Sequence, residues 1–115
     1  MSKVHYLIEF TISDGKKAEF ESKAKGFVAA TEANEQTTLE YNWYVDGNKC
    51  LLYEAFENSE ALLLHLGNVG PALPDLLAIA PITRFEVLGA VSDDARNALA
   101  TLGVAFFPLL TGFTR

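Results

Sequence analysis

Two segments with alternating apolar and polar residues meet at a short turn near the middle of the chain. Residues 39–45 and 49–56 both repeat with a period of two, which is the period of a β-strand. Asp46-Gly47-Asn48 separates them, and Asp-Gly is a strong signal for a tight hairpin turn because glycine tolerates a positive φ. The sequence therefore predicts an antiparallel pair of strands here, rich in aromatic residues.

Two further strands are predicted by the same period, at residues 4–12 and 82–91. Between the first strand and the hairpin, residues 16–34 change to a helical period, with Phe20, Ala24, Phe27 and Thr31 on one stripe. Asp14 is a candidate N-cap for this helix.

Short helices are predicted between the hairpin and the fourth strand. One begins after an Asn58 or Ser59 cap and ends at Gly67, and Pro74 starts another that ends at Pro81. The order is then β-α-β-β-α-β, which predicts the α+β class with a ferredoxin-like antiparallel sheet of four strands and helices on one face. A C-terminal helix from Ser92 to about Gly103 and an apolar tail follow.

The 115 residues predict one domain over 1–115, with a core at 4–91 and a C-terminal extension at 92–115. The net charge of −6, with scattered Lys and Arg, argues against nucleic acid or an anionic membrane as a partner. Cys50 is the only cysteine and allows no internal disulfide, which favours a reducing compartment. With no apolar block at the N-terminus, we expect a cytoplasmic protein.

The sheet face away from the helices carries more apolar residues than a face in contact with water should. Leu7, Leu51, Tyr53 and Ala55 lie on it, and so does either the pair Ile82 and Leu88 or the pair Phe85 and Val87. We therefore expect a homodimer that pairs through this face, with the apolar tail lying on the partner. The alternative is a monomer whose tail covers its own sheet.

The segments Thr38-Leu39-Glu40-Tyr41-Asn42-Trp43-Tyr44 and 52–66, with Gly15 and Phe20, resemble the antibiotic biosynthesis monooxygenase family. The resemblance implies a dimeric α+β barrel with a small pocket between sheet and helices in each subunit. Some members oxidise quinols or polycyclic aromatic phenols with O₂ and no cofactor, and others degrade haem. Of the three positions of the haem-degrading members, His65 matches, whereas Ile8 and Phe56 replace the expected Asn and Trp.

His65 and Glu54 are the candidate catalytic residues. A histidine on the short helix can take a proton from a phenol or hold its oxygen, and the resemblance strengthens that role. Glu54 shares a strand face with Leu52 and Phe56 and can orient His65. The alternatives are a structural helix-end histidine and, for Glu54, an ion pair with Arg84 or a position that reaches solvent at the sheet edge.

Four aromatic residues are candidate substrate-binding residues, although aromatics at strand spacing also serve as ordinary core: Tyr6, Tyr41, Trp43 and Phe56. Cys50 is expected to be a buried apolar residue rather than a nucleophile. His5 and His65 lie far apart and no cluster has metal-ligand spacing, so no metal or cofactor is predicted.

Two functions follow from these residues. The first is a cofactor-independent monooxygenase acting on a small phenol, quinol or polycyclic aromatic. The second is a non-enzymatic dimeric module of the same fold that binds a small ligand or another protein.

Overall fold

A computed structural model describes residues 3–115. The elements in chain order are β1 (Val4–Thr11), α1 (Lys17–Asn34), β2 (Thr38–Asp46), β3 (Lys49–Phe56), α2 (Ser59–Val69), a 3₁₀ turn (Gly70–Ala72), α3 (Leu73–Ile79), β4 (Ile82–Gly89), α4 (Asp93–Leu99), a second 3₁₀ turn (Ala100–Leu102) and β5 (Ala105–Phe107). The predicted α+β class, the β-α-β-β-α-β order and the hairpin are confirmed.

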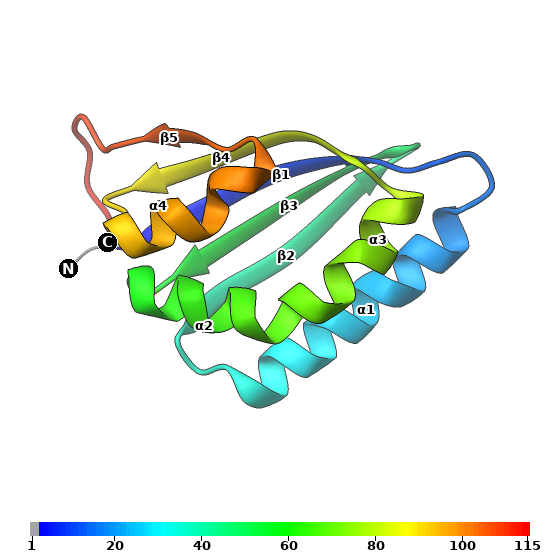
Figure 1. Ribbon diagram of the computed structural model, residues 1–115, viewed down its shortest axis with the longest axis horizontal. Helices are drawn as coiled ribbons and strands as arrows, with labels where there is room; N and C mark the ends of the chain where they lie inside the picture. The colour runs from blue at the N-terminus through cyan, green and yellow to red at the C-terminus, as the bar shows by residue number, and fades with distance from the viewer. Residues whose placement is uncertain (1–2) are drawn as a thin grey trace.

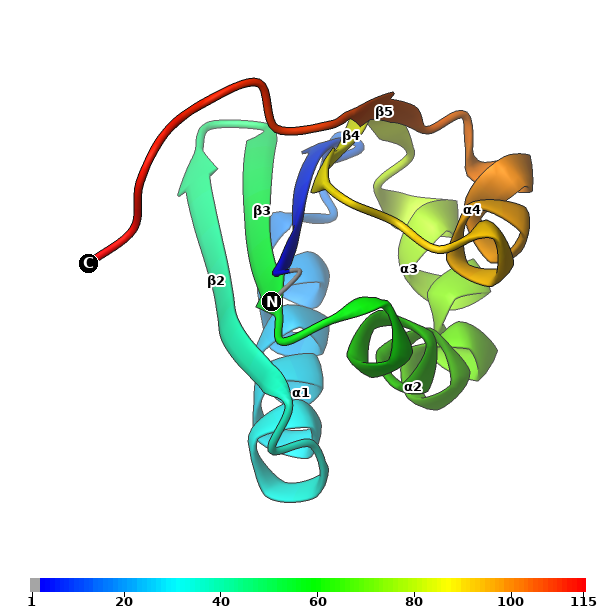
Figure 2. The ribbon, with the colours of Figure 1, turned by 90° about the vertical axis from the view of Figure 1, so that its left-hand side faces the viewer.

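The strands form one open sheet in the order β2-β3-β1-β4-β5 (Figure 1). The first four are antiparallel, whereas β5 runs parallel to β4. The helices lie on one side of this sheet, and Figure 2 shows no helix on the opposite side in the described part of the chain. The molecule therefore has two layers, and the other sheet face is bare.

The helix-facing side of the sheet forms the core. In β1 the residues Val4, Tyr6, Ile8 and Phe10 are buried while their neighbours are only partly buried, which is the predicted alternation. In β4 the buried residues are Phe85 and Val87, so Leu88 lies on the bare face, opposite His5.

Ile82 does not join Leu88 on the bare face as one predicted pairing required. A β-bulge between Glu9 and Phe10 shifts the register, so that Ile82 pairs with Phe10 and packs against the core. Of the two pairs predicted for the bare face, Ile82 with Leu88 and Phe85 with Val87, only Leu88 lies there.

The helical layer differs from the prediction in two ways. Asn58 caps α2, its Oδ1 accepting a hydrogen bond from the Ala61 amide at 2.9 Å, but Gly67 does not end the helix, which runs on to Val69. Asp14 does not cap α1, because the N-cap residue is Lys16 and makes no side-chain cap bond. Since α2 is longer than predicted, His65 lies inside it rather than at its C-terminal end.

The run Ser59–Ile79 is long and apolar enough to cross a membrane by length and mean hydropathy (1.4) alone. It includes the 3₁₀ turn and both short helices, and it places Leu62, His65 and Leu76 in the buried layer over the sheet. The run therefore forms part of the helical layer that covers one face of the sheet.

The C-terminal extension contains a strand that the sequence did not predict. β5 pairs Phe106 with Val87, and the guanidinium of Arg96 lies 4.4 Å from the centre of the Phe106 ring. Beyond β5, the side chains of Leu109, Leu110 and Phe113 are 76%, 95% and 77% exposed. The tail runs past the β2–β3 end of the sheet and ends away from β2, on the side opposite α2, α3 and α4 (Figure 2), and its large apolar residues are not buried against its own sheet.

Gly89 is the glycine whose replacement should harm the fold most. Its φ is +111°, and a Cβ there would lie 2.6 Å from the backbone oxygen of Lys3. We expect Gly89→Ala to destabilise the protein by about 2–3 kcal/mol, and so to lower Tm by roughly 10 °C. Gly47→Ala is the matched control, because φ is +60° but no atom lies within 4 Å. Gly47→Ala should destabilise the protein by only about 1 kcal/mol. If both variants lowered the Tm of thermal unfolding equally, a clash between position 89 and Lys3 would be contradicted.

Candidate functional site

His65 lies in α2 between two glutamates and is 2% exposed. Its Nδ1 is 2.8 Å from Oε1 of Glu35, and its Nε2 is 2.9 Å from Oε1 of Glu54. The first contact has hydrogen-bond geometry, whereas the second is close without the alignment of a hydrogen bond. The two carboxylates therefore approach the imidazole from opposite sides.

Glu54 comes from the middle of β3 and points toward the helices, as the alternation of side chains along the strand predicts. In the register of the sheet it lies between Tyr6 of β1 and Tyr41 of β2. It is 2% exposed, and its Oε1 has no hydrogen-bond partner within residues 3–115. The alternative pairing with Arg84 is wrong, because Arg84 contacts Glu86 at 2.6 Å on exposed surface.

Glu35 is a site residue that was not predicted from the sequence. It directly follows α1 and is only 5% exposed. Besides its bond to His65, it accepts hydrogen bonds from the Thr38 hydroxyl at 2.7 Å and the Asn68 amide at 3.0 Å. In the sequence it is one acidic residue in a polar linker, and no periodic pattern marks it as buried.

The three groups have displaced pKa values. Burial raises the pKa of Glu54 above its usual range, and the neighbouring His65 offsets only part of that effect. Burial alone would lower the pKa of His65, but its contacts with Glu54 and Glu35 raise it overall. Burial also opposes ionisation of Glu35, yet bonds from Asn68 and Thr38 and the nearby His65 leave its pKa lowered. The pKa shifts therefore favour the charged forms of Glu35 and His65 and the neutral form of Glu54.

A small internal cavity of about 40 Å³ lies beside His65 and Glu54. Of the aromatic residues predicted to bind substrate, Tyr6, Tyr41 and Trp43 line it. Phe56 does not, because it is fully buried behind the site, with its ring centre 5.4 Å from that of His65 and 5.0 Å from that of Tyr6. Phe56 therefore packs behind the site and does not line the cavity in this structure.

The cavity wall carries buried polar atoms without partners. In the described residues, the Tyr6 hydroxyl and the Trp43 indole nitrogen have no hydrogen-bond partner, like Oε1 of Glu54. Burial, with the charge of Glu54 next, raises the pKa of Tyr6, so its hydroxyl stays protonated. Unpaired buried polar atoms cost free energy, and their grouping around one cavity indicates a site for a polar ligand atom.

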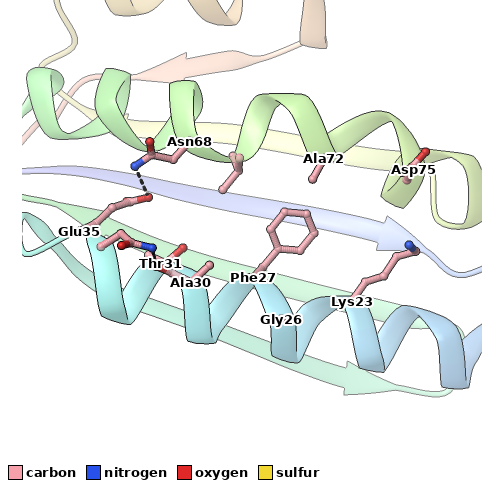
Figure 3. Close-up of a pocket in the computed structure, with 11 residues that line it drawn as sticks. Lys23, Gly26, Phe27, Ala30, Thr31, Glu35, Asn68, Ala72 and Asp75 are labelled. Atoms are coloured by element: carbon pink, nitrogen blue, oxygen red, sulfur yellow. Dashed lines mark hydrogen bonds between the residues drawn. The ribbon is translucent and has the colours of Figure 1, made fainter.

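A larger groove of about 470 Å³ lies between α1 on one side and α2 and α3 on the other (Figure 3). Glu35 and Asn68 lie at one end, joined by their hydrogen bond, and Lys23 and Asp75 lie at the other. Phe27 and Val69 line both the groove and the internal cavity. The two spaces therefore share a wall made of these side chains.

The remaining candidates lie apart from this site. His5 is on the bare sheet face, where its Nδ1 lies 2.7 Å from the Tyr53 hydroxyl. Cys50 is fully buried, and burial raises the pKa of its thiol to about 11, which disfavours a nucleophile. Glu35 and Glu54 approach different nitrogens of His65, so these three residues cannot converge on one metal ion.

Residues 4–70 match the model of the antibiotic biosynthesis monooxygenase family. No curated protein matches the chain.

Several solved structures share the fold. MupZ from Pseudomonas fluorescens has a TM-score of 0.91 and 26% identity over 100% of this chain and 96% of its own. SnoaB from Streptomyces nogalater, described as a cofactor-independent oxygenase, has a TM-score of 0.64 and 18% identity over 80% of this chain and 98% of its own. Rv0793 from Mycobacterium tuberculosis has a TM-score of 0.67 and 18% identity over 80% of this chain and 98% of its own.

MupZ matches the whole length, including the C-terminal extension, whereas SnoaB and Rv0793 match about four-fifths of the chain. The likeness to the latter two concerns the fold alone. Since the family match spans more than half of the chain and agrees with the observed fold, this protein belongs to the antibiotic biosynthesis monooxygenase family.

Proposed function

We propose that this protein is a cofactor-independent monooxygenase that oxidises a phenol, quinol or polycyclic aromatic with O₂. The observation that carries the proposal is the line Glu35–His65–Glu54, which ends at a cavity with unpaired polar atoms. A cofactor-free oxygenase needs a base that forms an electron-rich phenolate and a dry pocket that receives it. Family membership and the fold shared with SnoaB, a cofactor-independent oxygenase, add support.

Glu54 is the better placed base of the two predicted catalytic residues. Glu54 lines the cavity, and burial raises the pKa of its carboxyl, which makes it a stronger proton acceptor than an ordinary carboxylate. His65 then stabilises the ionised carboxylate through Nε2. Glu35 acts through His65 by holding Nδ1, so it is a positioning residue. The Tyr6 hydroxyl is suited to donate a hydrogen bond to the substrate oxygen.

The reaction balances with these groups. Glu54 takes the phenolic proton, and the phenolate passes one electron to O₂, giving a phenoxyl radical and superoxide. The two radicals combine at a ring carbon to form a peroxide. Loss of the C–H proton from that carbon and protonation of the distal oxygen break the O–O bond, releasing water and leaving a quinone. One oxygen atom of O₂ enters the product and the other enters water.

The first test is oxygen consumption with a panel of hydroquinones and naphthols. We expect Glu54→Gln and His65→Gln each to lower the rate about 100-fold, because each removes the proton acceptor or its charged partner. Glu32→Gln on the exposed face of α1 is the matched control and should keep the parent rate. If the parent binds these compounds without consuming O₂, the non-enzymatic binding function replaces this proposal.

The second test compares the stability of two glutamine variants. Glu54 has a raised pKa, so its ionisation costs stability as pH rises above the ordinary carboxyl range, and Glu54→Gln removes that cost. At pH 8 its Tm should equal or exceed that of the parent by up to about 5 °C. Glu35 has a lowered pKa, so its ionisation stabilises the fold at neutral pH and loses that effect in acid. Glu35→Gln should therefore lower Tm at pH 8, and the reverse order would refute this charge assignment.

We also propose that the protein is a homodimer that pairs through the bare sheet face. Leu51 is 39% exposed and Tyr44 is 58% exposed on that face, and Leu7 and Leu88 lie beside them in neighbouring strands. The exposed tail extends on the same side of the sheet (Figure 2) and is long enough to reach a partner. The His65 cavity lies on the opposite face, so each subunit would keep its own site.

Light scattering tests this assembly, with a monomer mass of 12.6 kDa for reference. We expect twice that mass for the parent and the monomer mass for Leu51→Lys, because a buried unpaired lysine in the interface is costly. Leu64→Lys is the matched control, since Leu64 is 50% exposed on α2 and away from the bare face. A parent that stays monomeric at micromolar concentration with its tail intact would contradict the dimer.

A further inference from the structure

The internal cavity is too small for the substrate that the chemistry requires. Its volume of about 40 Å³ has room for only a few water molecules. Pockets that enclose an organic ligand are roughly 300–1,000 Å³. The groove between α1 and the α2–α3 layer, at about 470 Å³, falls in that range. A substrate that reaches Glu54 therefore needs space beyond the cavity, and this groove adjoins the cavity at Phe27 and Val69.

Phe27 and Val69 line both spaces, so their side chains lie between the cavity and the groove. Phe27 projects from α1 into the gap between the helices (Figure 3), and its side chain is only partly buried. On its inner side it stacks on Trp43, with ring centres 6.1 Å apart. Phe27 is therefore the side chain that separates the two spaces on the α1 side.

The inner end of this path is built for a polar group. The Tyr6 hydroxyl and Oε1 of Glu54 belong to residues that are each 2% exposed, and neither atom makes a hydrogen bond within residues 3–115, although Oε1 lies 2.9 Å from Nε2 of His65. A phenolic oxygen fits there, because it can donate a proton to Glu54 and accept a hydrogen bond from Tyr6.

The groove itself suits an uncharged, slender group. Its middle is formed by Gly26, Ala30 and Ala72, which leave the space between the helices free of large side chains (Figure 3). At one end Glu35 and Asn68 already bond to each other. At the other end Lys23 and Asp75 carry opposite charges, so a substituent of either charge would meet one like charge.

We propose that the substrate is a phenol with an extended, uncharged apolar substituent, whose ring passes Phe27 into the cavity while the substituent lies in the groove between α1 and α2–α3. The phenol in this inference rests on the proposed function. The groove adds the substrate's shape and its path to Glu54, and Phe27 becomes the residue that controls access.

Trp43 provides a readout that does not depend on turnover, because it is the only tryptophan and it lines the cavity. Hydroquinone and 2-hexylhydroquinone are titrated against the protein without O₂, and the Trp43 fluorescence is followed. We expect the hexyl compound to bind about tenfold more tightly, since its chain leaves water for the groove. Equal affinities would overturn the inference.

Two alanines of α1 supply a matched pair of variants. Ala30 lines the groove, whereas its neighbour Ala29 lies on the side of α1 that faces β2, and both are exposed, so neither substitution should unfold the chain. Ala30→Phe should abolish the tenfold preference for the hexyl compound, and Ala29→Phe should retain it. Phe27→Ala should speed the fluorescence change for both compounds. Identical behaviour of the two alanine variants would place the chain outside the groove and refute the proposal.

The outcomes separate this inference from the monooxygenase proposal. If the hexyl preference and its loss in Ala30→Phe are observed but no O₂ is consumed, the groove is assigned correctly and the oxidation is wrong. If hydroquinones are oxidised through Glu54 with no effect of chain or groove variant, the oxidation stands and the groove assignment is wrong.

Discussion

The site depends on one costly contact, the burial of the Glu54 carboxyl against His65. A carboxylate taken out of water is tolerated only when charge and hydrogen bonds compensate it. His65 supplies the charge from α2 at 2.9 Å, and Glu35, held by Thr38 and Asn68, fixes the other side of the imidazole. The loop after α1, strand β3 and helix α2 are thus tied together by one buried charge system. A fold serving only stability would place an apolar residue at position 54.

Hydrogen bonds compensate the burial of Glu35 fully but that of Glu54 only in part, and this difference separates the roles of the two carboxylates. Glu35 has a partner for both carboxylate oxygens, whereas Oε1 of Glu54 lacks an aligned hydrogen bond. The pKa values of the two glutamates consequently move in opposite directions, although both contact the same histidine. One carboxylate is a fixed anchor and the other is available to exchange a proton, which is how two chemically identical groups take different roles.

The alternation of side chains along a strand explains how much of this site could be predicted from the sequence. A period of two puts Glu54, Tyr6, Tyr41 and Trp43 on the helix-facing side, and the structure has them there. The same rule also places Phe56 on that face, yet it says nothing of depth, and Phe56 lies behind the cavity rather than beside it. Glu35 belongs to a linker and has no period, so only the tertiary contact with His65 identifies it. Strand β5 is three residues long, too short for a period to appear.

The proposed dimer surface and the proposed active site lie on opposite faces of the sheet, and adjacent residues of β3 contribute to each of them. Tyr53 faces the bare side and bonds to His5, while Glu54 faces His65. A shift of one residue in β3 would exchange them, so the register must be secure at this row. The irregularities of the sheet lie elsewhere, between Glu9 and Phe10 in β1 and near Leu39 in β2. The row Tyr41–Glu54–Tyr6 is regularly paired, and the rigid centre of the sheet thereby holds the base in position opposite the helices.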